Sequence, residues 1–150
     1  MTTWRGALYL GMIDYGKFQK ALRHLELQHQ NYRTMDAALL PELLQEAVAE
    51  SVIQRFETCY DCLWKLLKRY LLEELGLPEV PNSPKPIFRL ANENQLFAAP
   101  VERWLRYADA RVGTSHDYSG EKALDCLGLM GDFIQDAWAL HRRMAGEPGA

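Results

Sequence analysis

The sequence lacks the hydrophobic segments that direct a protein into or across a membrane. No stretch approaches the roughly 18 consecutive apolar residues of a transmembrane helix, and no basic N-terminal segment precedes an apolar core of the kind found in signal peptides. Only three of the 150 residues are cysteine, an odd number that does not fit a disulfide framework. We therefore expect a cytoplasmic protein in a reducing compartment, with no membrane contact.

Strand-forming patterns and positive charge are scarce as well. Residues branched at the β-carbon are scattered and form no extended alternating run. The net charge of −3 gives no long-range attraction for nucleic acids, so any RNA contact would need a local basic cluster. Hydrophobic residues make up 48% of the chain and charged residues 25%, which is typical of a folded globular protein rather than a disordered one. We expect one domain over residues 1–150.

Helical periodicity is abundant in the first half of the chain. Apolar residues spaced alternately three and four apart predict a helix over residues 8–32 and a longer one that ends near 75, separated by residues 36–41. Gly76 is placed to end the second helix, and the four prolines of residues 77–86 predict an exposed linker. The positions expected on the buried faces are Tyr15, Phe18, Leu22, Leu25, His29 and Tyr32 in the first helix, and Val48, Val52, Phe56, Cys59, Leu63, Leu67 and Tyr70 in the second.

The second half of the chain predicts three more helices. Ser83 before Pro84 is typical of a helix start and indicates a short helix through residue 94. Another helix opens at Pro100 and ends at Gly113, and the last runs over about residues 119–144, with a flexible tail from about 146. Long helices with short connections favour antiparallel neighbours, so we expect an all-α, up-down bundle of four to five helices. The expected core positions of these helices are Trp104, Tyr107, Ala108, Leu124, Leu127, Phe133, Ile134 and Trp138.

Residues 111–118 combine a cation, hydroxyl groups, an imidazole and a phenol around a single glycine. Because this glycine ends the helix, Arg111 at the helix end and His116 in the following loop can converge on one small anion. Arginine offers a fork of donors to a phosphate, and histidine can transfer a proton near neutral pH. The alternative is structural: Arg111 would interact with the helix dipole, and Thr114 or Ser119 would cap a helix end.

Two separated stretches carry a family resemblance. The first runs Gln54-Arg55-Phe56-Glu57 and then Leu63-Trp64-Lys65-Leu66-Leu67-Lys68, and it is similar to a signature of R-F-E followed by W-K-x-L-K. The second, Arg111 to Tyr118, fits the pattern R-x4-H-x-Y. Together, and with the Ser83-Pro84 helix start between them, they resemble the family of nucleotidyltransferase substrate-binding proteins within the HEPN superfamily, over roughly residues 45–145.

The resemblance implies an HEPN-like helical bundle that forms a homodimer, in which Arg111 and His116 of both chains meet at one cleft. It also implies a partner, a minimal nucleotidyltransferase encoded nearby, in a module of the toxin–antitoxin kind that could reach a heterotetramer or a larger assembly. In such modules the helical subunit is a metal-independent ribonuclease, and the transferase restrains it by attaching nucleotide to the motif tyrosine, here Tyr118. Two-fold symmetry fits a reaction that needs both a base and an acid, since one chain offers a single motif histidine.

Val112 departs from this pattern, because active family members carry a polar residue after the motif arginine. The departure favours a partner or substrate-binding subunit as the first hypothesis. The alternative hypothesis is an active ribonuclease, with Arg111 holding the phosphate, His116 as the general acid or base, and Tyr118 as the regulatory acceptor of a nucleotide.

A second set of polar residues could contact RNA or a nucleotide substrate. Arg103 and Arg106 lie one turn apart and could supply the local basic patch that the overall charge lacks, and Thr114 and Ser115 offer hydroxyl groups nearby. The alternative for the two arginines is a solvated helix face, on which they pair with the neighbouring Glu102 and Asp109.

No residues predict a metal or a cofactor. Cys59 and Cys62 lie mid-helix without a second pair of ligands, so we interpret them as packing residues. Asp132 and Asp136 lie one turn apart on the last helix, where we expect a solvated face rather than a metal site. The chain has no Gly-Ser loop followed by a D-x-D strand, so it is not itself a nucleotidyltransferase.

Overall fold

The protein folds as a bundle of helices in a computed structural model that describes residues 13–146. This range contains five α-helices and no strand: α2 (Gly16–Thr34), α3 (Glu42–Arg69), α4 (Pro84–Glu93), α5 (Val101–Gly113) and α6 (Gly120–Ala145). A π-helical turn, η1 (Tyr70–Glu74), extends α3. The all-α bundle expected from the sequence is confirmed. The first helix begins later than predicted: residues 13–15 are not helical, and α2 starts at Gly16, whose backbone N–H donates to the carboxylate of Asp14. Residues 8–12 of that predicted helix and the tail beyond residue 146 lie outside the described residues.

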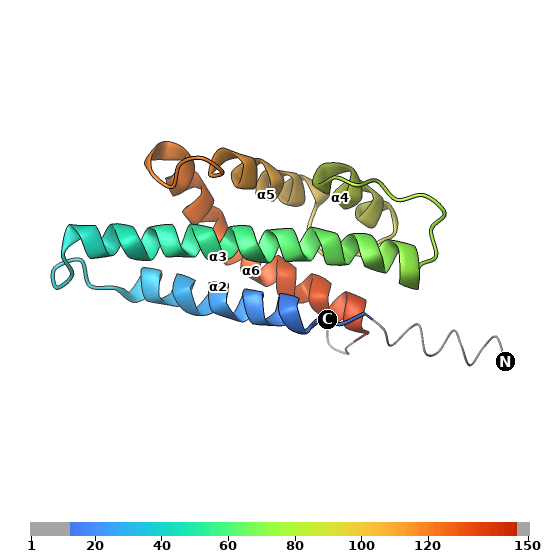
Figure 1. Cartoon of the computed structure of the whole chain (residues 1–150), viewed down its shortest axis with the longest axis horizontal. Helices are drawn as coiled ribbons and strands as arrows, with labels where there is room; N and C mark the ends of the chain where they lie inside the picture. Colours follow the sequence, from blue (N-terminus) through green and yellow to red (C-terminus); the bar gives the residue numbers. More distant parts are fainter. Residues whose placement is uncertain (1–12, 147–150) are drawn as a thin grey trace.

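Helix α3 is the long element against which most of the bundle packs. It lies antiparallel beside α2, and it also contacts α4 and α6 (Figure 1). Helices α4 and α5 lie on the side of α3 opposite α2, and α5 packs against α4 and α6 (Figure 1). Among the described residues, none of the helices combines the length and the apolarity needed to cross a membrane.

The helix ends agree with the local sequence signals. Residues 35–41 separate α2 from α3, as the pattern predicts. The extended α3 stops just before Gly76, whose backbone has a φ of +64°, a conformation that glycine adopts without strain. Helix α4 begins directly after Ser83, so the last residues of the proline-rich stretch lie inside its first turn, where proline is tolerated. Helix α5 ends at Gly113, as expected.

Aromatic rings from α3, α5 and α6 meet in the centre of the core. The rings of Phe56 and Phe133 contact edge to face with centroids 4.9 Å apart, and Tyr107 meets Phe133 in the same way at 5.1 Å.

The faces predicted to be buried in the first two helices are buried at most positions. The buried members of the predicted set are Phe18, Leu22, Leu25, His29, Val52, Phe56, Cys59, Leu63, Leu67, Trp104, Tyr107, Ala108, Leu127, Phe133 and Ile134.

Two expectations for α6 were wrong. Leu124, predicted in the core, is 66% exposed, because the buried face of this helix passes through Ala123, Leu127 and Met130 and leaves Leu124 to one side. Asp136, predicted on a solvated face, is only 8% exposed, because α5 covers it. The burial of this carboxylate determines where the neighbouring arginine of α5 points.

Candidate functional site

The motif predicted from the sequence lies where α5 ends and the loop to α6 begins. The hydroxyl of Thr114 is buried and donates to the carbonyl of Ala110 at 3.1 Å. The hydroxyl of Ser115 donates to the carbonyl of Val112 at 2.8 Å. These hydroxyl bonds add to the backbone hydrogen bonds that the carbonyls of Ala110 and Val112 accept from the N–H groups of Thr114 and Ser115. They fix the direction in which the chain leaves the helix.

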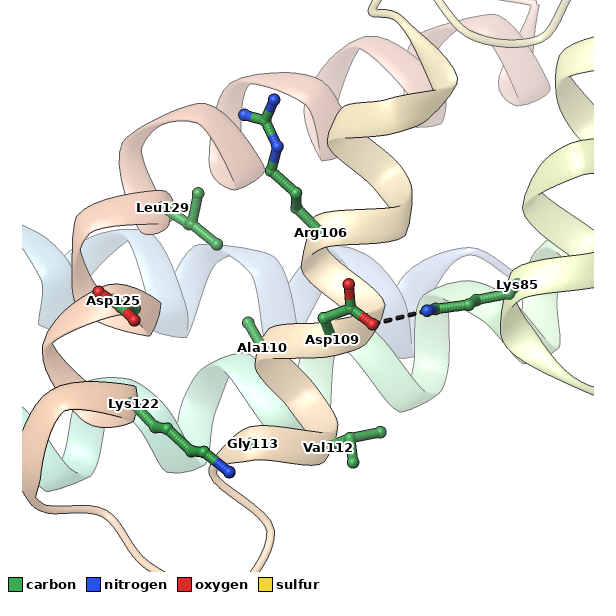
Figure 2. Close-up of a pocket in the computed structure, with 9 residues that line it drawn as sticks. All are labelled: Lys85, Arg106, Asp109, Ala110, Val112, Gly113, Lys122, Asp125 and Leu129. Carbon is green, nitrogen blue, oxygen red and sulfur yellow. Dashed lines mark ion pairs between the residues drawn. The ribbon is translucent and has the colours of Figure 1, made fainter.

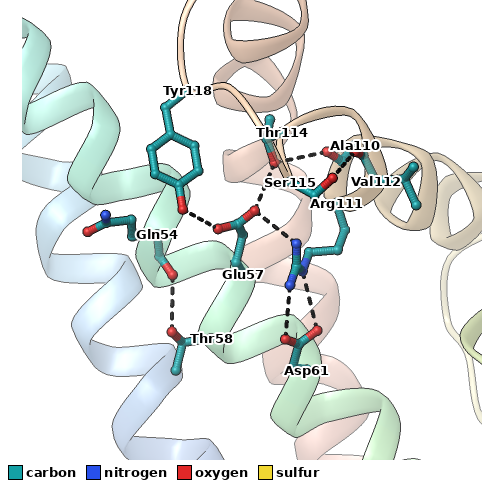
Figure 3. Close-up of polar contacts among 10 residues, drawn as sticks. All are labelled: Gln54, Glu57, Thr58, Asp61, Ala110, Arg111, Val112, Thr114, Ser115 and Tyr118. Atoms are coloured by element: carbon teal, nitrogen blue, oxygen red, sulfur yellow. Dashed lines mark hydrogen bonds and ion pairs between the residues drawn. The ribbon is translucent and has the colours of Figure 1, made fainter.

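Arg111 points across this loop toward two carboxylates of α3 (Figure 3). Its Nη1 donates to Glu57 Oε2 at 2.9 Å, and its Nη2 and Nε donate to the two oxygens of Asp61 at 3.2 and 3.3 Å. Glu57 and Asp61 are four positions apart, so they share one face of α3. The hydrogen bond to Asp61 and the two negative charges raise the pKa of Arg111, while partial burial opposes this. The guanidinium is therefore held as a cation with its donors directed at this chain's own carboxylates.

Tyr118 joins the same carboxylate from the other end of the loop. Its hydroxyl donates to Glu57 Oε1 at 2.7 Å, while Thr114 donates to Oε2 at 3.3 Å (Figure 3). The hydrogen bond to Glu57 is the main cause that raises the pKa of Tyr118, and the neighbouring Gln54 and Arg111 oppose the shift. The phenol is thus protonated at neutral pH and is half-buried. We call Glu57, Asp61, Arg111 and Tyr118 the motif cluster.

His116 lies apart from these contacts in the structure. Its side chain is exposed, and no hydrogen bond or ion pair is recorded for it among residues 13–146. Val112, just after the motif arginine, is 73% exposed and presents an apolar surface beside the loop. That Arg111 and His116 act on one anion stays a prediction, since it concerns a second chain or a bound phosphate.

Arg103, predicted to contact RNA or substrate, is directed into the bundle instead. Its Nη2 and Nε donate to the two oxygens of Asp136 at 2.6 and 3.1 Å, and the hydroxyl of Tyr107 donates to Asp136 as well. This bidentate pair is the geometry that arginine and carboxylate favour. The hydrogen bonds raise the pKa of Arg103, and burial is the main cause that raises the pKa of Tyr107. We call Arg103, Tyr107 and Asp136 the buried cluster.

Arg106, the other predicted contact, lines an open groove between α5 and α6 (Figure 2). The groove has a volume of about 730 Å³ and also carries the cations Lys85 and Lys122. Lys85 is paired with Asp109 at 2.6 Å. Asp109 therefore pairs with Lys85 of α4 and not with the arginines of α5, as one alternative had predicted. Arg106 lies on a surface that a ligand could reach.

The remaining candidates behave as packing residues. Cys59 is fully buried, and burial is the main cause that raises its thiol pKa well above the ordinary value. No group of three or more His, Cys, Asp or Glu residues placed to hold a metal ion occurs among the described residues.

Sequence reasoning missed three carboxylates that organise the site. Glu57 lies inside the R-F-E signature, and the sequence pattern indicates no partner for Glu57, Asp61 or Asp136. The signal for the first two was their spacing of four on a helix whose opposite face is apolar. The signal for Asp136 was its place between the buried positions Phe133 and Ala137.

Comparisons with known proteins agree with the resemblance seen in the sequence. A family model described as "Nucleotidyltransferase substrate binding protein like" matches residues 13–146. A protein of Haemophilus influenzae named "Probable ribonuclease HepT" is 26% identical over 129 residues, covering 85% of this chain and 85% of that protein.

Two solved structures share the fold. A protein of Thermus thermophilus has a TM-score of 0.69 and 27% identity, and the match covers 85% of this chain and 98% of that one. A protein of Haemophilus influenzae has a TM-score of 0.78 and 24% identity, with 88% and 99% covered. This second structure is described as revealing the fold of a substrate binding domain of a nucleotidyltransferase.

Proposed function

Because this chain belongs to the family of nucleotidyltransferase substrate-binding proteins, we propose that it is the partner subunit of a separately encoded minimal nucleotidyltransferase. The two proteins would form a module of the toxin–antitoxin kind, in which the transferase attaches nucleotide to Tyr118. A homodimer of this chain, alone or bridged by transferase subunits, is part of the same proposal.

The observation that carries this proposal is the position of the Tyr118 hydroxyl. It lies on a loop between two helices, at the surface, with its oxygen 2.7 Å from a carboxylate. A loop that projects from a rigid bundle can enter the active site of a second protein without unfolding the first. The phenol oxygen is a nucleophile once its proton is removed, so the tyrosine suits the role of acceptor.

The test uses the chain and the transferase encoded beside it. Both are purified, their binding is measured, and incorporation of label from each α-labelled ribonucleoside triphosphate is followed in the presence of magnesium. We expect a stable complex and label on Tyr118, which the Tyr118→Phe variant loses. Tyr32→Phe serves as the control, because Tyr32 is a half-buried tyrosine on α2. No binding and no label would contradict the proposal.

A second candidate function, a metal-independent ribonuclease, is supported by the relative named as a ribonuclease, which matches over most of both chains. Arg111 would hold the phosphate and His116 would transfer the proton, with Arg106, Thr114 and Ser115 near the RNA. The engagement of Arg111 by Glu57 and Asp61 and the exposed Val112 favour the partner role instead.

Cleavage of a mixed RNA pool in EDTA separates the two functions. Products that end in a 2′,3′-cyclic phosphate, lost in His116→Ala, would establish the ribonuclease. If the wild-type chain forms a folded dimer but cleaves RNA no faster than His116→Ala, the ribonuclease function is excluded and the partner role remains.

A further inference from the structure

The Glu57 carboxylate is the junction of the motif cluster. Tyr118 donates to its Oε1, and Arg111 and Thr114 donate to its Oε2. The side chain of Glu57 is only 12% exposed, so these bonds replace most of the water it would otherwise bind. A carboxylate held this way has one oxygen neutralised by a cation and the other directed at a phenol proton.

We propose that Glu57 is the general base that removes the proton of Tyr118 when a nucleotide is transferred to this tyrosine. The inference rests on the proposed function, since it concerns the reaction at the same hydroxyl. It assigns a catalytic role to the partner subunit itself, because the group that activates the acceptor belongs to this chain and not to the transferase.

Tyr118 Oη forms a bond to the α-phosphorus of a nucleoside triphosphate held by the transferase. The bond from that phosphorus to the oxygen bridging the α- and β-phosphates breaks, and pyrophosphate leaves with the electron pair. The phenol proton passes to Glu57 Oε1 as the new bond forms. Transfer during bond formation is favoured because the phenol becomes more acidic as its oxygen bonds to phosphorus.

The resting state shows why a base is needed. The hydrogen bond to Glu57 raises the pKa of Tyr118, so the hydroxyl is protonated before the reaction. The acceptor of the phenol proton is Glu57 Oε1, whereas the side chain of Gln54 beside the phenol acts as a donor to it and lowers the pKa of Tyr118 (Figure 3). An amide carries no charge and is a far weaker base than a carboxylate.

The charges around Glu57 suit this role. Arg111 of α5 donates to one oxygen of Glu57, and it also pairs with Asp61, which lies on α3 like Glu57. The other titratable group near Glu57 is the thiol of Cys126 on α6. Burial, together with the negative charge of Glu57, raises the pKa of this thiol to about 12, so the thiol is neutral. Arg111 is therefore the cation beside Glu57, and it lies on the side away from the phenol.

The test compares Glu57→Gln with Asp61→Asn in the labelling assay with the transferase and the triphosphate that labels the wild-type chain. Glutamine keeps the size and one oxygen of the side chain but cannot accept the proton, so labelling is expected to slow about 100-fold. Asparagine at position 61 also removes one negative partner of Arg111 but leaves the Tyr118 contact intact, so a much smaller loss is expected. Binding to the transferase and the thermal unfolding of each variant are measured in parallel.

A more acidic phenol distinguishes a base from a structural contact. Difluorotyrosine placed at position 118 releases its proton more easily than tyrosine, so it needs less help from a base. It is expected to restore much of the labelling in Glu57→Gln while changing the wild-type rate far less. If the contact between Glu57 and Tyr118 only orients the loop, fluorination should change the labelling rate of the wild-type chain and of Glu57→Gln by the same factor.

The outcomes separate the two claims. Labelling of the wild-type chain on Tyr118 supports the proposed function in either case. The role of Glu57 is wrong if Glu57→Gln is labelled as fast as the wild type, or if it is labelled slowly and difluorotyrosine does not restore the rate. If the wild-type chain takes no label, or takes it elsewhere than Tyr118, both are wrong.

Discussion

Helix α5 carries two sets of side chains with the same chemistry and different surroundings. The buried cluster joins Arg103, Tyr107 and Asp136 across α5 and α6, and the motif cluster joins an arginine, a tyrosine and carboxylates across α5, its following loop and α3. In both, a carboxylate accepts from an arginine and from a phenol. Tyr107 is fully buried, whereas the tyrosine of the motif cluster is half-buried on a loop.

The difference in burial separates a structural role from the chemical role that we propose for the motif cluster. In the buried cluster the carboxylate of Asp136 and the hydroxyl of Tyr107 are both buried, so the loss of either leaves a buried polar group without its partner, and the cluster fixes α5 on α6. In the motif cluster water and a second protein can reach the phenol, so its hydrogen bond to Glu57 can be exchanged at a smaller cost than that of Tyr107 to Asp136. The buried cluster therefore holds α5 in place, and the end of α5 carries Arg111 of the motif cluster.

Asp136→Ala is the largest expected disruption, because it leaves the hydroxyl of Tyr107 buried without its partner and removes the carboxylate from Arg103. We expect the free energy of unfolding to fall by about 3 kcal/mol, the lower end for a broken buried pair, since Arg103 is partly exposed. Urea unfolding measures the change. Asp132→Ala, one turn away and exposed, is the control and should have little effect. Equal losses in the two variants would contradict the structural role.

Tyr107→Phe is expected to cost about 1.5 kcal/mol, the value of a hydrogen bond to a charged acceptor. The variant also changes the response to alkali. Burial raises the pKa of Tyr107, so the unfolded chain releases this proton first, and stability is lost as pH rises above about 10. Tyr15, whose pKa burial raises to about 12, adds to the same loss in both chains.

Urea midpoints at neutral and alkaline pH measure this effect. The wild-type chain should lose more stability between the two conditions than Tyr107→Phe. Tyr118→Phe should differ little from wild type at neutral pH, because its phenol is only half-buried on a loop, where water can replace the lost hydrogen bond. A larger cost for Tyr118→Phe than for Tyr107→Phe would reverse the comparison between the clusters.

Glu57→Gln is expected to lower stability by about 1 kcal/mol, because glutamine keeps an acceptor and Arg111 retains Asp61. Its effect on nucleotide transfer should therefore exceed its effect on folding. Differential scanning calorimetry of the variant and of Asp61→Asn gives the stability side. A loss as large as that of Asp136→Ala would mean that the motif cluster is structural after all.

Val112→Thr is the smallest expected change. The side chain is 73% exposed, so the free energy of unfolding should stay within about 0.5 kcal/mol of wild type. The variant places a polar group beside the motif arginine, so RNA cleavage is measured on it together with unfolding. A clear loss of stability would show that Val112 is covered by a second chain in solution.

The sequence predicted the elements of the fold better than their contacts. Proline and glycine signals placed the breaks near residues 36–41, 76 and 113, because those residues act on the backbone locally. Leu124 was misassigned because a helical pattern shows which residues are apolar, and not which face the neighbouring helices cover.

The candidate site was predicted only in part for a related reason. Arg111 and Tyr118 lie seven positions apart, and their motif is visible in the sequence. Glu57 lies 54 and 61 positions away from them, so its contacts depend on how α3 packs beside the loop. Arg103 looked like a surface cation because nothing near it in the chain reveals a carboxylate 33 positions later.

The sequence by itself determined that this protein is helical, where most of its helices begin and end, and which loop carries the polar motif, because these depend on residues within a few turns of one another. Only the tertiary structure decided which carboxylate each arginine pairs with and which of the two tyrosines is fully buried. The physical reason is that the cost of burying a charge, and the partner that offsets it, are set by helices brought together from distant parts of the chain.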